Sequence, residues 1–118
     1  MADIEHEDSY TIKNNAAMIG VRVRILGGHS GAWVVTIDDM PVAPQPDGFV
    51  SLGLGSLVRG REVVITTLLT KIAAGKKFTV EHEVREVSAA GGSTTPLEVK
   101  DDFGTKNTSE VEETVSFS

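Results

Sequence analysis

Cysteine is absent from this chain of 118 residues. Its absence excludes disulfide bonds, thiolate nucleophiles, cysteine-ligated zinc and iron–sulfur clusters. Long apolar runs are also missing, because none approaches the roughly 20 residues that a helix needs to cross a bilayer. We therefore expect no membrane partner. The acidic first residues lack the apolar core of a secretory signal, so a cytoplasmic location is expected if Met1 is the natural start.

Basic residues are scarce, since 11 Lys and Arg stand against 17 Asp and Glu and give a net charge of −6. Residues 1–8 and 98–118 carry −4 each, which leaves +2 for residues 9–97. Nucleic-acid binding needs a basic surface that replaces phosphate counterions, so we expect no nucleic-acid partner. A chain of this length forms one domain. We assign residues 1–8 to an acidic, flexible tail and residues 9–118 to a single domain.

Aromatic residues make up only 5% of the chain. Surfaces that bind sugars or single-stranded nucleic acids rely on exposed aromatic faces. Trp33 and Phe78 fall at core-facing positions of expected strands, and few aromatic residues remain. The sequence therefore favours neither kind of surface.

Residues branched at Cβ are abundant, with 15 Val, 7 Ile and 11 Thr. Such residues favour strands over helices. Apolar and polar residues alternate over 19–25, 33–37 and 77–85, with the period of two of a half-buried strand. Glycine-rich 27–31 and proline-containing 44–48 supply turns. These patterns predict an all-β fold, a single antiparallel β-sandwich of seven to nine short strands with immunoglobulin-like or related Greek-key topology.

Two segments interrupt the simple strand pattern. The run of β-branched residues after Glu62 favours a strand, but the spacing of apolar residues over 62–74 also fits a helical face that stops at Gly75. We therefore expect at most one short helical turn, near 71–74. Val87 is out of phase with the preceding alternation, which predicts a bulge or a strand end near Glu86.

The glycines of residues 53–60 match a phosphate-binding loop only in part. Gly55 and Gly60 have the spacing of a P-loop, but Arg61 stands where a lysine would reach the phosphates. Phosphate-binding loops also lead into a helix, whereas the next segment is an expected strand. We interpret these residues as a connection between strands, in which Arg59 and Arg61 are candidate contacts for an anion or partner.

The three histidines do not follow a metal-ligand pattern. His6 lies in the expected tail, and His82 points away from its flanking glutamates on an expected strand. Neither His-x-His nor His-x-x-x-His occurs, so no metal site is predicted. We interpret His82 as a hydrogen-bonded core histidine. His29, in the glycine-rich loop, is a candidate for partner binding together with Trp33.

Acidic residues at expected strand ends leave a calcium-dependent binding module open as a further alternative. Carboxylates are the oxygen ligands that calcium uses. The Asp-x-Asp-x-Asp-Gly spacing of a calcium loop is absent, which favours solvated turn residues. The acids concerned are Asp38, Asp39, Asp47, Asp101 and Asp102.

We predict a non-catalytic binding or assembly module without a cofactor, a subunit of a homo-oligomer or of a larger bacterial or viral assembly. The prediction follows from the missing catalytic motifs and from sheet edges, which pair readily with another chain. The alternative is a small β-barrel that binds a ligand or acts as an enzyme. The candidate partner-binding residues are His29, Trp33, Arg59 and Arg61, and those of the alternative site are His29, Asp38, Asp39 and His82.

Overall fold

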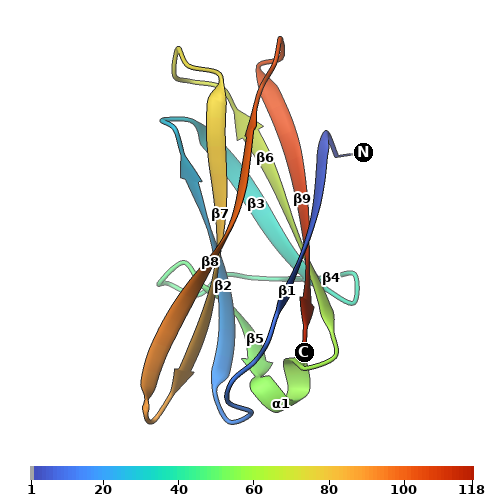
Figure 1. Cartoon of the computed structure of the whole chain (residues 1–118), viewed down its shortest axis with the longest axis vertical. Coiled ribbons are helices and arrows are strands. Elements are labelled where there is room, and N and C mark those ends of the chain that lie inside the picture. The colour runs from blue at the N-terminus through green and yellow to red at the C-terminus, as the bar shows by residue number, and fades with distance from the viewer. Residues whose placement is uncertain (1) are drawn as a thin grey trace.

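The computed structural model describes residues 2–118 and contains nine strands and one short helix in that range (Figure 1). The elements are β1 (Ile4–Tyr10), β2 (Met18–Leu26), β3 (Ser30–Ile37), β4 (Met40–Val42), β5 (Val50–Leu54), α1 (Gly55–Val58), β6 (Glu62–Thr70), β7 (Lys77–Ser88), β8 (Gly91–Asp102) and β9 (Thr108–Phe117). The strands form two sheets, ordered β1-β9-β6-β3-β4 and β5-β2-β7-β8. Every strand pair is antiparallel except β1 with β9, which is parallel. The prediction of an all-β fold is confirmed.

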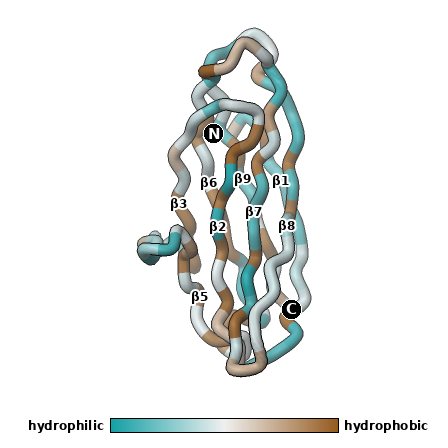
Figure 2. The backbone as a smooth tube through the Cα atoms, turned by 90° about the vertical axis from the view of Figure 1, so that its left-hand side faces the viewer, coloured by the Kyte–Doolittle hydropathy of each residue, from teal (hydrophilic) through white to brown (hydrophobic). Residues whose placement is uncertain are grey.

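Alternate side chains of both sheets meet in one hydrophobic core, as the period of two requires. Hydrophobic and hydrophilic positions alternate along β2 and β7 (Figure 2). The central strand β6 runs over Glu62–Thr70, so the strand interpretation of that segment is confirmed. The fully buried side chains include Val21, Val35, Val63, Ile65, Leu69, Val80, Val84, Val111 and Val115.

The N-terminal segment forms an edge strand where the sequence predicted a tail. Residues Ile4–Tyr10 pair in parallel with β9, with Ile4 opposite Val111 and Tyr10 opposite Phe117. Alternate residues of β1 point inward, and Tyr10 is buried in the core. The tail prediction rested on acidity, but the acids Glu5 and Glu7 occupy only the exposed face of this strand. The acidic segment is therefore part of the five-stranded sheet.

The short helix lies at Gly55–Val58, not near residues 71–74 where a helical turn was expected. Its first N–H groups donate to carbonyls of the β1–β2 connection, from Gly55 to Ala17 and from Ser56 to Asn15. A Cβ at Gly55 would lie 2.6 Å from the Asn14 carbonyl oxygen, so this contact needs glycine. No helix among the described residues is long and apolar enough to cross a membrane.

Of the two alternatives expected near Glu86, the bulge is wrong, because β7 pairs with β2 and β8 in continuous register past that residue, whereas the strand does end nearby, at Ser88. The register shift lies instead between Ile19 and Gly20, where β2 pairs with β5. Val87 is out of phase with the inward-facing apolar residues of β7 because its side chain lies on the outer face of the sheet. There it is exposed beside Met18, its exposed apolar partner on β2. An out-of-phase apolar residue thus marks the outer surface and not a kink.

Candidate functional site

His29 holds a loop in place and is buried just before β3. Its Nδ1 accepts hydrogen bonds from the N–H groups of Ile72 and Ala73 at 3.2 and 3.3 Å, and its Nε2 donates to the Lys77 carbonyl at 3.2 Å. The ring also contacts Phe103 edge-on, with centroids 4.9 Å apart. Both ring nitrogens are thus engaged by the backbone.

The two candidate arginines also bind parts of the same chain. Arg59 donates to the Asn15 side chain at 2.7 Å and to the Ile12 carbonyl at 3.0 Å. Arg61 pairs with Asp38 at 2.9 Å, in the turn between β3 and β4. These contacts join the α1–β6 connection to the β1–β2 connection and to the β3–β4 turn.

The alternative site near His29, Asp38, Asp39 and His82 is not brought together. His29 and Asp38 flank opposite ends of the eight-residue strand β3, which separates them by roughly 27 Å of strand length. His82 lies on β7, in the other sheet, and its side chain is buried in the core. Asp38 and Asp39 adopt left-handed backbone conformations, with φ of 51° and 63°, in the turn after β3.

The remaining candidate calcium ligands act as local turn acceptors. Asp47 accepts from the Phe49 N–H at 3.0 Å, and this bond, followed by Arg85, lowers the pKa of Asp47. Asp101 and Asp102 accept from backbone N–H groups at 2.8 Å each. Each of these three carboxylates therefore accepts a hydrogen bond from a backbone N–H one or two residues further along the chain.

Trp33, the fourth candidate, lies on a stretch of β3 that has a free edge. β6 pairs with all of β3, but β4 covers only Val35–Ile37 on the other side. Among the described residues, no strand pairs with Ser30–Val34 on that side. We call this segment the open edge. In an antiparallel strand, alternate N–H and C=O groups point away from the paired neighbour, so the open edge presents free backbone donors and acceptors.

The other edges of the two sheets each carry a feature that discourages pairing with another chain. Charged side chains, prolines and bulges all have this effect, and so does a short strand. The open edge contains none of them, since its sequence is Ser-Gly-Ala-Trp-Val. The features elsewhere are charges on β1 and on the part of β2 beyond β5 (Glu5, Glu7, Arg22 and Arg24), prolines in β4 and β8 (Pro41 and Pro96), and the register shift beside β5.

An apolar surface adjoins the open edge on the outer face of the five-stranded sheet. Val34 and Leu68 are 43% and 51% exposed on neighbouring strands β3 and β6. With Ala32, Trp33 and Thr66 they line a shallow, mostly apolar hollow. The open edge therefore combines free backbone groups with uncovered apolar side chains.

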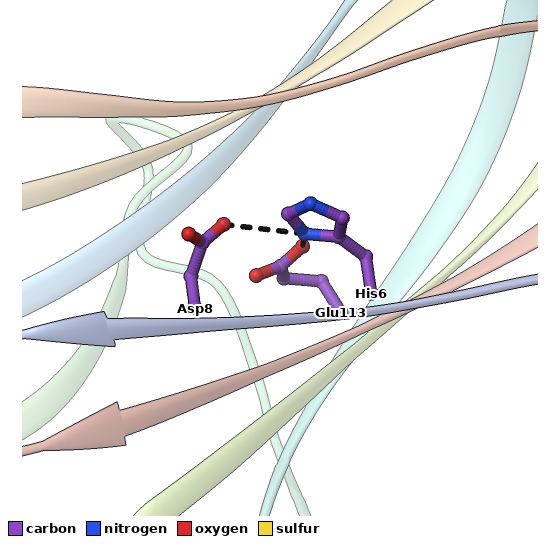
Figure 3. A group of neighbouring side chains, drawn as sticks. All are labelled: His6, Asp8 and Glu113. Carbon is purple, nitrogen blue, oxygen red and sulfur yellow. Dashed lines mark hydrogen bonds and ion pairs between the residues drawn. The ribbon is translucent and has the colours of Figure 1, made fainter.

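A second region of interest lies in the interior, beside β1 and β9 (Figure 3). His6 Nδ1 is 2.7 Å from Glu113 Oε2 and 3.2 Å from Asp8 Oδ2. We call these three residues the carboxylate–histidine cluster. The parallel register places His6 opposite Glu113, and the alternation of β1 puts His6 and Asp8 on the same inward face. Pairing of the two ends of the chain thus creates the cluster.

Three buried side-chain atoms of the described residues lack hydrogen-bond partners, and one of them belongs to the cluster. Glu113 is 0% exposed, and its Oε1 has no hydrogen-bond partner among the described residues. The same holds for His82 Nε2 and Thr67 Oγ1. His82 Nδ1 lies 3.3 Å from the Leu97 carbonyl and 3.8 Å from Glu113 Oε2. The expected core histidine is confirmed, but only one of its nitrogens is satisfied.

Burial changes the ionisation of these groups. It raises the pKa of Glu113 to about 7, an effect that Asp8 reinforces and His6 opposes. Burial also lowers the pKa of His82 to about 4, against the smaller effect of the Leu97 carbonyl. At neutral pH, His82 is therefore uncharged and Glu113 is close to its midpoint.

Glu86, a second buried acid, is fully satisfied. It accepts a hydrogen bond from the Tyr10 hydroxyl and two from the N–H groups of Lys13 and Asn14, at 3.0 and 3.2 Å. Burial, followed by Glu86, raises the pKa of Tyr10 to about 12. This carboxylate secures the connection between β1 and β2, and Glu113 has no comparable set of donors.

Sequence reasoning missed the cluster because its residues are 107 positions apart and meet through a parallel pair. A local signal exists in the last strand, where Glu113 falls in the apolar phase between Val111 and Val115. His6 and Asp8 likewise share a phase with Tyr10. A charged residue within the apolar phase of a strand marks a buried polar group.

No protein-family model, curated protein or solved structure matches this chain. Function must therefore be inferred from the open edge and the carboxylate–histidine cluster themselves.

Proposed function

We propose that this protein is a non-catalytic assembly module, and that two copies join by antiparallel pairing of their open edges. One observation carries the proposal. Among the described sheet edges, Ser30–Val34 alone has no feature that discourages pairing with another chain. Engagement of both His29 nitrogens by backbone groups supports a role without catalysis.

The fold that we propose for this module is a β-sandwich with a Greek-key topology related to the immunoglobulin fold. A core shared by both sheets supports the sandwich. The order β4-β3-β6-β9 is comparable to the immunoglobulin sheet that contains strands C, F and G, with β3, β6 and β9 in the places of these three strands. The hairpin β7–β8 is a departure, because it lies between β6 and β9 in the chain and joins the other sheet.

Pairing of the open edge with itself satisfies the backbone on both copies. Antiparallel pairing centred on Ala32 places Ser30 of one copy opposite Val34 of the other, which is a two-fold symmetric contact. The free N–H and C=O groups then complete a ladder, and the exposed Val34 side chains gain cross-strand neighbours. The result is a continuous ten-stranded sheet across two molecules.

Charge favours this edge over the others. The acidic strand β1 lies at the opposite end of the sheet order, four strands from β4, so pairing at β3 keeps the two acidic edges apart. Residues 9–97, which include the open edge, carry only +2. Electrostatic repulsion between copies is therefore small at the proposed contact.

Light scattering over a wide range of protein concentration tests the proposal. We expect a reversible dimer of the wild-type chain that dissociates on dilution. Val34→Lys places a charge beside the open edge on a side chain that already faces solvent, so it is expected to give a monomer. Leu57→Lys is the matched control, because Leu57 is 64% exposed on α1 and its substitution is expected to leave the dimer intact.

Two results would overturn the proposal. One is a wild-type chain that stays monomeric at every concentration. The other is equal dimerisation of the wild type and of Val34→Lys, which would place the contact elsewhere. Circular dichroism of each variant establishes that the comparison is made between folded proteins.

A further inference from the structure

The carboxylate–histidine cluster offers three metal-ligand atoms of suitable kinds at suitable distances. The Nδ1 of His6, a carboxylate oxygen of Asp8 and a carboxylate oxygen of Glu113 all lie within 4.8 Å of one another. Ligands at about 2.0–2.1 Å from a tetrahedral ion are about 3.3 Å apart. The separation of 3.2 Å between His6 Nδ1 and Asp8 Oδ2 fits that spacing. The 2.7 Å separation between His6 Nδ1 and Glu113 Oε2 is shorter, and these two atoms would have to move slightly apart to bind the same ion.

The charges of the cluster call for a cation. Asp8 and Glu113 approach the same imidazole nitrogen, and Glu113 is completely buried. Two carboxylates in one partly buried site repel each other, and burial of an uncompensated charge is costly. A divalent ion would neutralise both, and it would displace the proton from the His6 nitrogen that it binds.

An unsatisfied buried atom provides an independent indication. Glu113 Oε1 has no hydrogen-bond partner among the described residues, although the Glu113 side chain is 0% exposed. Another buried acid, Glu86, accepts three hydrogen bonds, so this chain is able to satisfy a structural carboxylate. Native proteins rarely leave buried polar atoms without partners unless an ordered water, an ion or a ligand completes the site.

Solvent can reach the cluster from the edge of the sheet. The side chains of His6 and Asp8 are 39% and 30% exposed, whereas Glu113 closes the inner side. An ion could therefore enter past β1 and contact the buried carboxylate without unfolding the sheet.

We infer that His6, Asp8 and Glu113 bind a divalent transition-metal ion of the Zn²⁺ type between β1 and β9. One imidazole with two carboxylates is a donor set that Zn²⁺ accepts, and the remaining position is left for water or a further ligand. Ca²⁺ is disfavoured, because it takes six to eight oxygen ligands. The bound ion would link the N-terminal and C-terminal strands of the sheet.

Isothermal titration of the full chain with Zn²⁺ alone, and separately with Ca²⁺ alone, tests this inference. We expect one Zn²⁺ per chain, a rise in melting temperature with Zn²⁺, and no binding of Ca²⁺. Asp8→Asn and Glu113→Gln each remove one ligand and are expected to weaken Zn²⁺ binding by about 100-fold. The visible absorption of bound Co²⁺ provides a second reading of the same site.

Glu7→Gln is the matched control. Glu7 neighbours Asp8 and carries the same charge, but it lies on the exposed face of β1. Its substitution is expected to change Zn²⁺ affinity less than twofold. It also distinguishes the interior cluster from chelation by the local sequence Glu5-His6-Glu7.

The inference would be overturned by a wild-type chain that does not bind Zn²⁺, or by Zn²⁺ binding that survives both Asp8→Asn and Glu113→Gln. An equal loss of affinity in Glu7→Gln and Asp8→Asn would also contradict it, because the ion would then be held by the exposed face. If Glu113→Gln fails to fold, Asp8→Asn decides the question, since Asp8 is partly exposed.

Discussion

Glu113 and Glu86 are buried carboxyl groups in very different surroundings. Glu86 accepts hydrogen bonds from the Tyr10 hydroxyl and two backbone N–H groups, whereas one oxygen of Glu113 has no partner among the described residues. A satisfied buried carboxylate stabilises the fold, but a half-satisfied one costs free energy when it is ionised. These two residues therefore predict opposite effects of substitution.

Glu113 makes the metal-free protein less stable as the pH rises. The pKa of Glu113 is raised from 4.5 to about 7, so the folded state holds the proton more tightly than the unfolded chain. The effect on stability is absent below pH 4.5, where both states are protonated, grows between pH 4.5 and about 7, and levels off above that, where both states are ionised. We expect the unfolding free energy of the wild type, relative to Glu113→Gln, to fall by on the order of 3 kcal/mol between pH 4 and pH 8.

Urea denaturation of both proteins across this pH range, with a chelator present, measures the difference directly. His82 titrates in the same range with its pKa lowered to about 4, but it is present in both proteins and its contribution largely cancels. A difference that does not change with pH would show that Glu113 is not perturbed by burial.

Tyr10 is expected to be important for stability because its hydroxyl donates a hydrogen bond to the buried Glu86 carboxylate. Tyr10→Phe removes the hydroxyl and leaves one Glu86 oxygen without its donor, at a cost of about 1–3 kcal/mol in unfolding free energy. Thermal unfolding at pH 7 checks this value. Thr11→Val is the control, since the Thr11 hydroxyl contacts only Ser118 at the surface, and it should stay within about 0.5 kcal/mol of the wild type. A neutral Tyr10→Phe would contradict the account of Glu86.

Among single residues, the sequence allowed His82 to be placed correctly in the core, because alternation along one strand is a local signal. It did not allow His6 to be placed. Its inward position depends on pairing with a strand at the other end of the chain, and nothing in the neighbouring acids specifies that contact.

At the level of elements, the strands in which apolar and polar residues alternate regularly were predictable from the sequence. The strands whose conformation depends on hydrogen bonds to a paired neighbour were not. The alternation in residues 77–85 predicted most of β7. The first part of β8, Gly91–Thr95, has no apolar alternation and is a strand because the hairpin with β7 supplies its hydrogen bonds. β1 is a strand for a similar reason, because β9 supplies its hydrogen bonds. Pairing partners, unlike periodicity, are not local information.

β3 depends on a glycine for its close approach to β2 and β6. A Cβ at Gly31 would lie 2.7 Å from both the Ile25 side chain and the Leu68 carbonyl oxygen. Gly31→Ala should therefore displace the strand and destabilise the protein by about 1–3 kcal/mol. Gly75→Ala, where a Cβ meets nothing within 4 Å, should be neutral or slightly stabilising. Denaturant midpoints of the two variants provide the measurement, and equal midpoints would contradict the close approach at Gly31.

At the level of the whole molecule, the net charge of −6 is concentrated along one edge. The acidic ends of the chain pair with each other, with Glu5 opposite Glu112, while β3 lies on the far side of β6. The concentration of charge at the termini was evident in the sequence. That the two terminal strands β1 and β9 lie side by side at one side of the sheet, and that the uncharged open edge lies on the other side, follows only from the fold.

Amide hydrogen–deuterium exchange of the wild-type chain at low and high concentration tests most directly whether the open edge joins two copies. We predict that amides of Ser30–Val34 that point away from β6 become protected at high concentration, and that those of β1, β5 and β8 do not change. Val34→Lys should show no such gain. Exchange in Ser30–Val34 that is independent of concentration, or protection that appears at another edge, would contradict the proposed assembly.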